Sequence, residues 1–483
     1  MTEQRPLASR VLSGSLILVL TQVVGFGLLF LAQRIILSTL TKEENGELFV
    51  YRRIADIIVI TLCDAGLNSV AMRMMARKPD RADEVIASVA VFRIVMGVIG
   101  TIIAMSVALV SGYTALGVGL WAIYVMISTR TGLLRYTLET PLRMDVRFGF
   151  VSLFSVLDAV LFLLAIWVVR DGLDAQTIIV AFLLSVLPSF LFLLWMDRGR
   201  HFRPSLASRS MTIELLREAT PVIVSVLLLN IHDKVDAFLL KWFSTPTEVG
   251  VFSAAYQSLA PLVNTMPIAA VMAIVPVVAK LAQEDEVRSR AYALTGLRLL
   301  GTVGIGVATV TSMLTPIIIH VVSNGRYADN EPQFFAFLWM TFPIFLLFYV
   351  QELNIALGAQ RKNIRITGVL AVGTVAAGLV LIPWYDSMGA IVAKFIAVGT
   401  GAAVAVGLFF RILGKSLTLS TVGGAVGTAA ACALASWLLP QLMPRPLAVI
   451  CGVIVWGGMS AVVGLLRRSD VAHLRTVFKR NAG

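Results

Sequence analysis

The sequence predicts an all-α membrane protein with about fourteen transmembrane helices, divided into two six-helix lobes and a C-terminal helix pair. Three observations predict this fold. Of the 483 residues, 58% are hydrophobic and only 14% are charged, whereas a soluble domain carries roughly 25% charged residues. Apolar stretches of about 20 residues, the length that crosses a bilayer, recur with short polar gaps between them. Lys and Arg are concentrated in alternate gaps, as is typical of a chain that crosses a membrane repeatedly.

The apolar stretches define the predicted helices. In chain order they span 13–36, 47–70, 85–110, 113–134, 149–169, 176–196, 220–243, 249–279, 292–320, 333–357, 365–384, 388–410, 419–439 and 446–466. The first is too long for a signal-peptide core and lacks a small-residue cleavage pattern, so we expect it to be retained. The second contains Arg52 and Arg53. The eighth contains Pro261, Pro267 and Pro276 and is predicted to be kinked.

The charges of the loops orient these helices, because cytoplasmic loops retain Lys and Arg. With the N-terminus inside, 27 of the 40 basic residues fall on cytoplasmic segments, five fall on external loops and eight lie within helices. We therefore expect a multi-pass protein of the cell inner (plasma) membrane with both termini cytoplasmic. The same bias explains the net charge of +12, and no long basic arm indicates nucleic acid as a partner.

A long basic cytoplasmic segment separates the two predicted lobes. The predicted organisation is an N-terminal lobe at 1–196, a cytoplasmic linker at 197–219, a C-terminal lobe at 220–412, and an additional helix pair with a cytoplasmic tail at 413–483. The lobes echo each other, because TKEENGELFVY begins the second helix and TPTEVGVFSAAY begins the eighth. Glu44 and Gly46 thereby match Glu248 and Gly250. Repeats of one orientation are an architecture of secondary transporters.

Three segments carry the motifs of a transporter family. One is ATPVIVSVLLLNIHDKVDAFLLKWFSTPTEVGVFSAAYQSL, in which a proline-led helix with a mid-helix Asp leads into a short loop and G-x-(Y/F)-x-A-A-Y. The others are LNIALGAQRKNIRITGVLAVGTVAAGLVLIPWYDSMGAIVAKF and, in the first lobe, LCDAGLNSVAMRMMARK. In order and spacing they resemble polysaccharide (Wzx-type, O-antigen and exopolysaccharide) flippases of the multidrug/oligosaccharidyl-lipid/polysaccharide (MOP) superfamily. The resemblance covers 10–412.

The resemblance implies a fold and a substrate class. It implies two lobes around a central cavity that opens alternately to the two sides, and a hydrophilic glycan on an undecaprenyl-pyrophosphate anchor. It also implies contact with membrane lipids and with polysaccharide polymerase or export proteins. The extra helices at 419–439 and 446–466 depart from the commonest twelve-helix pattern. A lipid II flippase branch has fourteen helices, but its motifs are not evident in this chain.

Basic residues inside predicted helices are candidate ligands, because a charge at the bilayer centre costs at least about 2.5–3.5 kcal/mol and usually faces a cavity or a partner. The eight are Arg34, Arg52, Arg53, Arg93, Arg130, Lys234, Arg298 and Lys394. Arg34 and Arg130 lie near helix ends, where their side chains can reach the interface. We predict that the pyrophosphate binds in the cavity at Arg52, Arg53, Arg93, Lys234 and Arg298, because guanidinium donors match phosphate oxygens.

The balance of charge places this anion nearer the first lobe, where five intrahelical Arg outnumber three intrahelical Asp. Successive residues of a helix point about 100° apart, so Arg52 and Arg53 cannot both face the cavity equally. In the second lobe, Asp233 and Asp236 are three residues apart and share a helix face. Asp233, Asp236 and Glu352 are predicted to serve as an ion or proton relay or to contact the glycan. The alternative is an internal pair of Asp with Lys234 that fixes helix packing.

Other kinds of chemistry find no support in the sequence. Three Cys and four His are dispersed without metal-ligand spacing, and no nucleotide-binding glycine loop is present. We therefore expect neither a metal site nor a cofactor, and no enzymatic activity. A glycan polymerase or ligase would need a large external loop, whereas the longest predicted one, 321–332, is short. The remaining alternatives are a cation-coupled multidrug or metabolite exporter of the same superfamily and a lipid II-type flippase.

Overall fold

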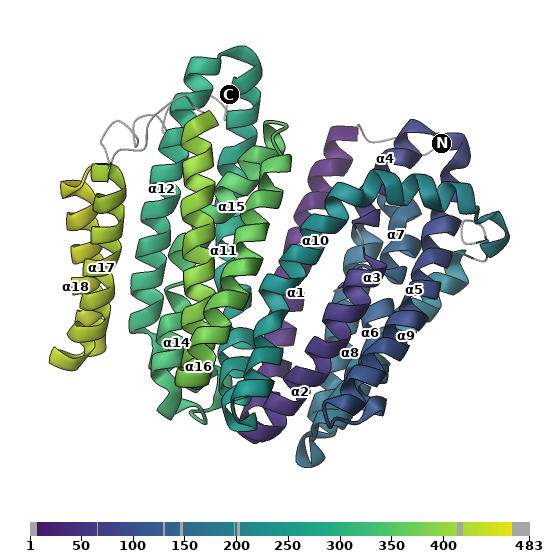
Figure 1. Ribbon diagram of the computed structural model, residues 1–483, viewed down its shortest axis with the longest axis horizontal. Coiled ribbons are helices and arrows are strands. Elements are labelled where there is room, and N and C mark those ends of the chain that lie inside the picture. The colour runs from purple at the N-terminus through teal and green to yellow at the C-terminus, as the bar shows by residue number, and fades with distance from the viewer. Residues whose placement is uncertain are drawn as a thin grey trace. The chain divides into compact units, whose positions relative to one another are not determined.

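The computed structural model of the chain describes residues 7–64, 66–128, 131–144, 148–197, 199, 203–412 and 419–465. These residues are almost entirely helical and contain no strand, which confirms the all-α prediction. Eight of their helices are long and apolar enough to cross a membrane. Each predicted segment lies mainly on helix, but the number of membrane crossings stays a prediction. The contacts between residues divide the chain into two compact units. Figure 1 labels the helices of both units.

The first unit comprises Met1–Lys241 and Thr245–Gly250. Its α-helices are α1 (Leu7–Thr39), α2 (Lys42–Ala55), α3 (Thr61–Cys63), α4 (Leu67–Arg77), α5 (Ala82–Val110), α6 (Ala115–Ile127), α7 (Leu134–Met144), α8 (Phe148–Val168), α9 (Ala175–Asp197) and most of α10 (Arg209–Phe243). Within this unit α1 packs on α8, α8 on α9, and α5 on α6. A buried cluster that includes Met74, Val85 and Met211 joins α4, α5 and α10.

The second predicted helix is the least regular part of this unit. A π-helix, Asp56–Ile60, follows α2 and leads into α3. The helix is then interrupted, because Gly66 adopts a left-handed conformation with φ 65° before α4 begins. A side chain at Gly66 would also meet Val222 of α10 at 2.2 Å. The predicted helix 47–70 is therefore several short segments, and the polar residues around the break face neighbouring helices.

A short helix, α7, follows the fourth predicted helix and was not expected from hydropathy, because LRYTLETPLRM is polar and brief. Arg135, which the loop count assigned to a cytoplasmic loop, lies on this helix. Arg135 is fully buried and pairs with Glu139 at 3.0 Å and with Asp158 at 2.6 Å. The two acids compensate it, so burial of this arginine is possible. Arg130 and 145–147 lie outside the described residues, as do the linker residues 198 and 200–202.

The second unit comprises Trp242–Ser244 and Val251–Gly483. Its α-helices are α11 (Pro246–Glu284), which begins in the first unit, α12 (Glu286–Met313), α13 (Thr315–Ser323), α14 (Glu331–Leu338), α15 (Thr341–Ala356), α16 (Arg361–Ile412), α17 (Leu419–Leu442) and α18 (Arg445–Val462). The three prolines lie inside α11. Asp386 interrupts α16 with φ 49° and ψ −128°, between the predicted helices 365–384 and 388–410.

The two C-terminal helices α17 and α18 pack against each other and against α12. The indole of Trp456 donates a hydrogen bond to the carbonyl of Thr302 at 2.8 Å. Its ring covers Gly306, where an added Cβ would lie 2.7 Å from the ring. Cys432 is buried in the same contact. Residues 413–418 and the predicted tail at 466–483 lie outside the described part of the chain, and the lobe boundaries stay predictions.

The two repeated motifs meet in space. A capping box between Thr41 and Glu44 starts α2, and the Asn45 amide donates to the carbonyl of Gly250 at 3.0 Å. A Cβ at Gly250 would lie 1.8 Å from the carbonyl oxygen of Lys42. The hydroxyl of Thr247 donates to Glu43, and this bond lowers the pKa of the Glu43 carboxyl. The matched glycines therefore let the first turn of α11 lie directly on the start of α2.

Candidate functional site

Arg52 and Arg53 leave α2 in different directions, as the 100° spacing predicts. The guanidinium of Arg52 lies over the ring of Trp121, 4.7 Å from its centre, and over that of Phe182 at 5.3 Å. Trp121 in turn donates its indole N–H to Asp56 at 2.8 Å. Arg52 is thus enclosed by the aromatic side chains of α6 and α9, where cation–π attraction stabilises it.

Arg53 points to α10, where it forms the centre of the candidate site. Its Nη1 lies 3.4 Å from Oδ2 of Asp233, and Nζ of Lys234 lies 3.5 Å from the same oxygen. The side chains of Arg53 and Lys234 are 8% and 9% exposed, whereas that of Asp233 is 36% exposed. Two buried cations from two helices therefore meet at one half-exposed carboxylate. Such a pair of cations is suited to an anion with several oxygens.

Neutral polar groups support this cluster from the irregular second helix. Lys234 donates to the Asn230 side-chain oxygen at 2.5 Å, and the Asn230 amide lies 3.4 Å from the hydroxyl of Thr61 in α3. Asp64, at the break after α3, interacts electrostatically with both Lys234 and Arg93. The cluster thus includes residues of α2, α10, α3 and α5. The π-helix before α3 places the Thr61 side chain where it contacts α10.

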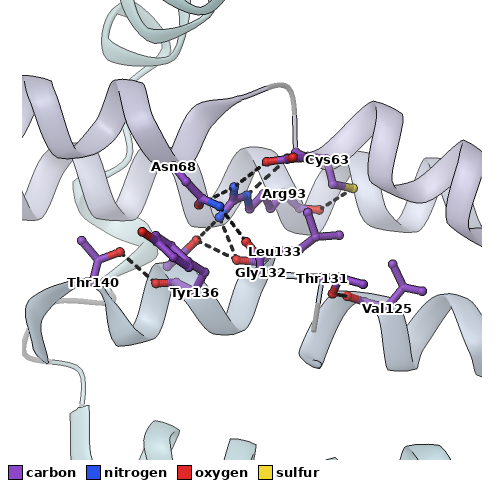
Figure 2. A network of polar contacts seen from close by, with 11 residues as sticks. Cys63, Asn68, Arg93, Val125, Thr131, Gly132, Leu133, Tyr136 and Thr140 are labelled. Carbon is purple, nitrogen blue, oxygen red and sulfur yellow. Dashed lines mark hydrogen bonds and ion pairs between the residues drawn. The ribbon is translucent and has the colours of Figure 1, made fainter. Parts of the chain in front are cut away.

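Arg93 of α5 is fully buried and donates to several groups of the chain itself (Figure 2). Its Nε donates to the carbonyl of Cys63 at 3.2 Å, and its Nη2 to the side-chain oxygen of Asn68 at 2.8 Å. Its Nη1 donates to the carbonyl of Leu133 at 2.7 Å and to the hydroxyl of Thr137 at 2.6 Å. This guanidinium therefore ties the broken second helix and α7 to α5.

The other predicted site residues are distributed over both units. Asp236 lies one turn after Asp233 on α10 but is buried, and its carboxylate accepts from the backbone N–H of Ala237 at 2.8 Å. Arg298 and Glu352 are half-buried in the second unit, on α12 and α15. The structure therefore brings Arg53, Asp233 and Lys234 together and places Arg52 and Arg93 in contacts of their own. Binding by any of these residues stays a prediction.

Sequence reasoning missed a second buried polar network, formed by Arg135, Glu139, Asp158 and Ser189. The Ser189 hydroxyl accepts from Arg135 at 2.8 Å and donates to Asp158. Its signal in the sequence was the spacing of four between Arg135 and Glu139, which places both on one helix face. Among the described residues, no group of three or more His, Cys, Asp or Glu side chains could hold a metal ion.

Comparison with known proteins bears on the family and the fold of the chain. The profile of the family described as polysaccharide biosynthesis protein matches residues 11–282. No curated protein matches the chain. Among solved structures, the lipid II flippase MurJ in an inward closed conformation is similar with a TM-score of 0.68 at 10% identity, over 93% of this chain and 98% of that one.

Two further similar structures are transporters of the MOP superfamily. One is an inward-facing multidrug resistance MATE family transporter, with a TM-score of 0.61 and 18% identity over 82% of this chain and 98% of that one. The other is a MOP superfamily transporter from Pyrococcus furiosus, with a TM-score of 0.57 and 16% identity over 85% of this chain and 99% of that one. The fold is thus that of MOP superfamily transporters, and this multi-pass membrane chain belongs to the polysaccharide biosynthesis protein family.

Proposed function

We propose that this chain flips a lipid-linked oligosaccharide with a polyprenyl-pyrophosphate anchor from the cytoplasmic to the outer leaflet of the inner membrane, by alternating access. The glycan would serve cell-surface polysaccharide such as lipopolysaccharide or exopolysaccharide. Membership of the polysaccharide biosynthesis family and the transporter fold support this function. The polymerase and export proteins that use the translocated glycan are the expected partners.

One observation carries the proposal: Arg53 and Lys234, both buried, converge on a single carboxylate oxygen. A buried cation is retained in a membrane protein chiefly where a partner or a ligand neutralises it. A pyrophosphate would offer both cations several oxygens in place of one. Arg53 contributes paired donors to it and Lys234 a compact point charge. Arg52 and Arg93, whose guanidinium groups contact the chain itself, would hold the surrounding helices in position.

The test is binding of farnesyl pyrophosphate, a short-chain probe of the anchor, to the purified protein. Removing a charged hydrogen-bond partner costs about 1.5–3 kcal/mol, so Arg53→Gln should weaken binding about 10- to 150-fold. In a strain that lacks its own flippase, the same variant should abolish surface glycan while the folded protein remains in the membrane.

Arg77→Gln is the matched control. Arg77 also pairs with a carboxylate of α10, Glu218, at 3.8 Å, but its side chain is 65% exposed. Surface pairs of this kind contribute little, so this variant should bind the probe and support glycan export normally. Full activity of Arg53→Gln in both assays would remove the pyrophosphate site from the proposal.

The multidrug exporter alternative has the same fold but a different ligand charge. An exporter of organic cations would bind its substrate through carboxylates, and Arg53→Gln would then retain transport. Cation-dependent export of dyes by the purified protein, with no binding of farnesyl pyrophosphate, would favour that alternative. For a lipid II-type flippase the anchor is the same, so only the glycan that accumulates inside cells lacking the protein would distinguish it.

A further inference from the structure

We propose that Asp233 is an internal substitute for the substrate's phosphate: the substrate displaces it from Arg53 and Lys234, and a proton then neutralises the displaced carboxylate. This inference rests on the proposed function and deepens it, because it states how an empty site is stabilised and which ion is exchanged. It assigns Asp233 a part in the transport cycle that a fixed ion pair for helix packing would not have.

The geometry distinguishes a movable carboxylate from fixed cations. The same oxygen, Oδ2 of Asp233, faces both cations, at 3.4 Å from Arg53 and 3.5 Å from Lys234. The described ion pairs of this unit span 2.6 Å, between Arg135 and Asp158, to 3.8 Å, between Arg93 and Asp64, so both contacts of Asp233 lie in the longer half of that range. Asp233 is also the exposed member of the cluster. Its contacts with both cations are thus long and its side chain is accessible, as expected of a displaceable group.

The arrangement of the other charges keeps the cations in place when Asp233 leaves. Lys234 remains bonded to Asn230 and interacts with Asp64, which also interacts with Arg93 of α5. On α10 itself, His232 and Asp236 flank the pair and are buried. Arg53 is the charged group that α2 presents to Asp233. When the Asp233 carboxylate is displaced, Arg53 and Lys234 would therefore stay in position to bind the phosphate.

The chemistry of displacement supplies the proton step. A pyrophosphate carries two or more negative charges, so a released Asp233 carboxylate would lose both positive partners and lie beside an anion. A like charge nearby favours the protonated form of a carboxylate. One proton is taken from the aqueous buffer, forms an O–H bond on Asp233, and is returned to the buffer when the phosphate leaves. No redox step or second reactant is needed.

A proton fits this site better than a metal ion does. A bound metal ion requires several ligand atoms around it, and among the described residues no group of three or more acidic, His or Cys side chains is arranged to hold one. Asp233 moreover lies beside two cations, which repel a metal ion. A single carboxylate that exchanges its salt bridges with Arg53 and Lys234 for one proton needs no further ligand atoms.

The experiment is calorimetric binding of farnesyl pyrophosphate to the purified full-length protein in buffers of different ionisation enthalpy, near neutral pH. Wild-type protein should take up about one more proton per bound ligand than Asp233→Asn does, because both share the ligand's own proton changes. Since Asp233→Asn has no internal competitor, it should also bind about tenfold more tightly. Asp233→Glu, which keeps the charge, should restore both the weaker affinity and the proton uptake.

Glu218→Gln is the matched control, because Glu218 lies on the same helix, is 35% exposed and faces an arginine. It should leave affinity and proton uptake at wild-type values. Equal affinity and equal proton uptake in wild type and Asp233→Asn, with Arg53→Gln still impaired, would overturn this inference alone. Absence of any probe binding by wild type would overturn the proposed function itself. Repeating the wild-type titration at a pH where the free probe is fully ionised removes the probe's own proton changes, and the uptake then measured does not depend on a variant folding.

Discussion

Arg53 and Arg93 are both buried arginines of the first unit, yet their guanidinium groups have different surroundings. Arg53 meets one carboxylate oxygen at 3.4 Å, whereas Arg93 donates to two backbone carbonyls, an amide and a hydroxyl. The planar fork of guanidinium suits that second set, because its donors point in several fixed directions. A residue type alone therefore does not separate a cation proposed to bind the ligand from one that fixes the fold.

We predict that Arg93→Lys destabilises the protein without altering the ligand site. An ammonium on a shorter stem cannot reach the acceptors on α3, α4 and α7 together, so unfolding should become easier by about 2–4 kcal/mol. Thermal unfolding in detergent, followed by circular dichroism, measures this change. Arg34→Lys, at an exposed position of α1, is the control. A stable Arg93→Lys protein that no longer binds farnesyl pyrophosphate would instead make Arg93 a ligand.

At the scale of elements, the contact between the starts of α2 and α11 depends on two residues without side chains. A Cβ at Gly46 would lie 2.4 Å from the carbonyl oxygen of Pro246, and one at Gly250 would lie 1.8 Å from that of Lys42. Both obstacles are backbone atoms, which cannot rotate away as a side chain does. The sequence repeat thus marks a place where the two elements approach each other, which a comparison of the motifs alone would not show.

We predict that Gly250→Ala destabilises the first unit by about 1–3 kcal/mol, the usual effect of forcing extra volume into a packed site. Hydrogen exchange of the backbone at 42–50 should increase as the two helix starts separate. Gly407→Ala in α16 is the comparison, because an added Cβ there has no atom within 4 Å. That change should be neutral or stabilising by up to about 1 kcal/mol. Equal stability of the two variants would contradict the close approach.

For the whole molecule, most helices could be predicted because hydropathy is a local property of the chain. Helix α7 could not, since its eleven residues are too polar and too few to resemble a membrane span. The cost of intramembrane charge drew attention to Arg53, Asp233 and Lys234, whose side chains the structure brings together. That Arg53 pairs with Asp233, 180 residues away, could not be predicted, because such pairing depends on how α2 and α10 pack.

The topology of the whole chain yields a separate prediction, which follows from the loop charges. In a variant lacking Cys63, Cys432 and Cys451, cysteines introduced at Asp171 and Asp329 should react with a membrane-impermeant maleimide added to intact cells. A cysteine at Asp80 should react only after the membrane is opened. All three positions are exposed in the structure, so lack of reaction reports the side of the membrane. Labelling at Asp80 in intact cells would invalidate the predicted orientation.

The π-helix Asp56–Ile60 has a consequence for how the chain tolerates changes in length. Arg53 and Thr61 both reach α10, although eight residues of regular α-helix would turn them about 80° apart. A π-helical turn accommodates about one extra residue, which brings the two to within about 20° of each other. Deleting one residue from this segment would leave regular α-helix that still holds Arg53 and Thr61 within about 20° of each other, because seven residues turn about 700°. Inserting one residue would instead rotate everything after it relative to Arg53, so the chain would keep every side chain of the cluster and lose their common face.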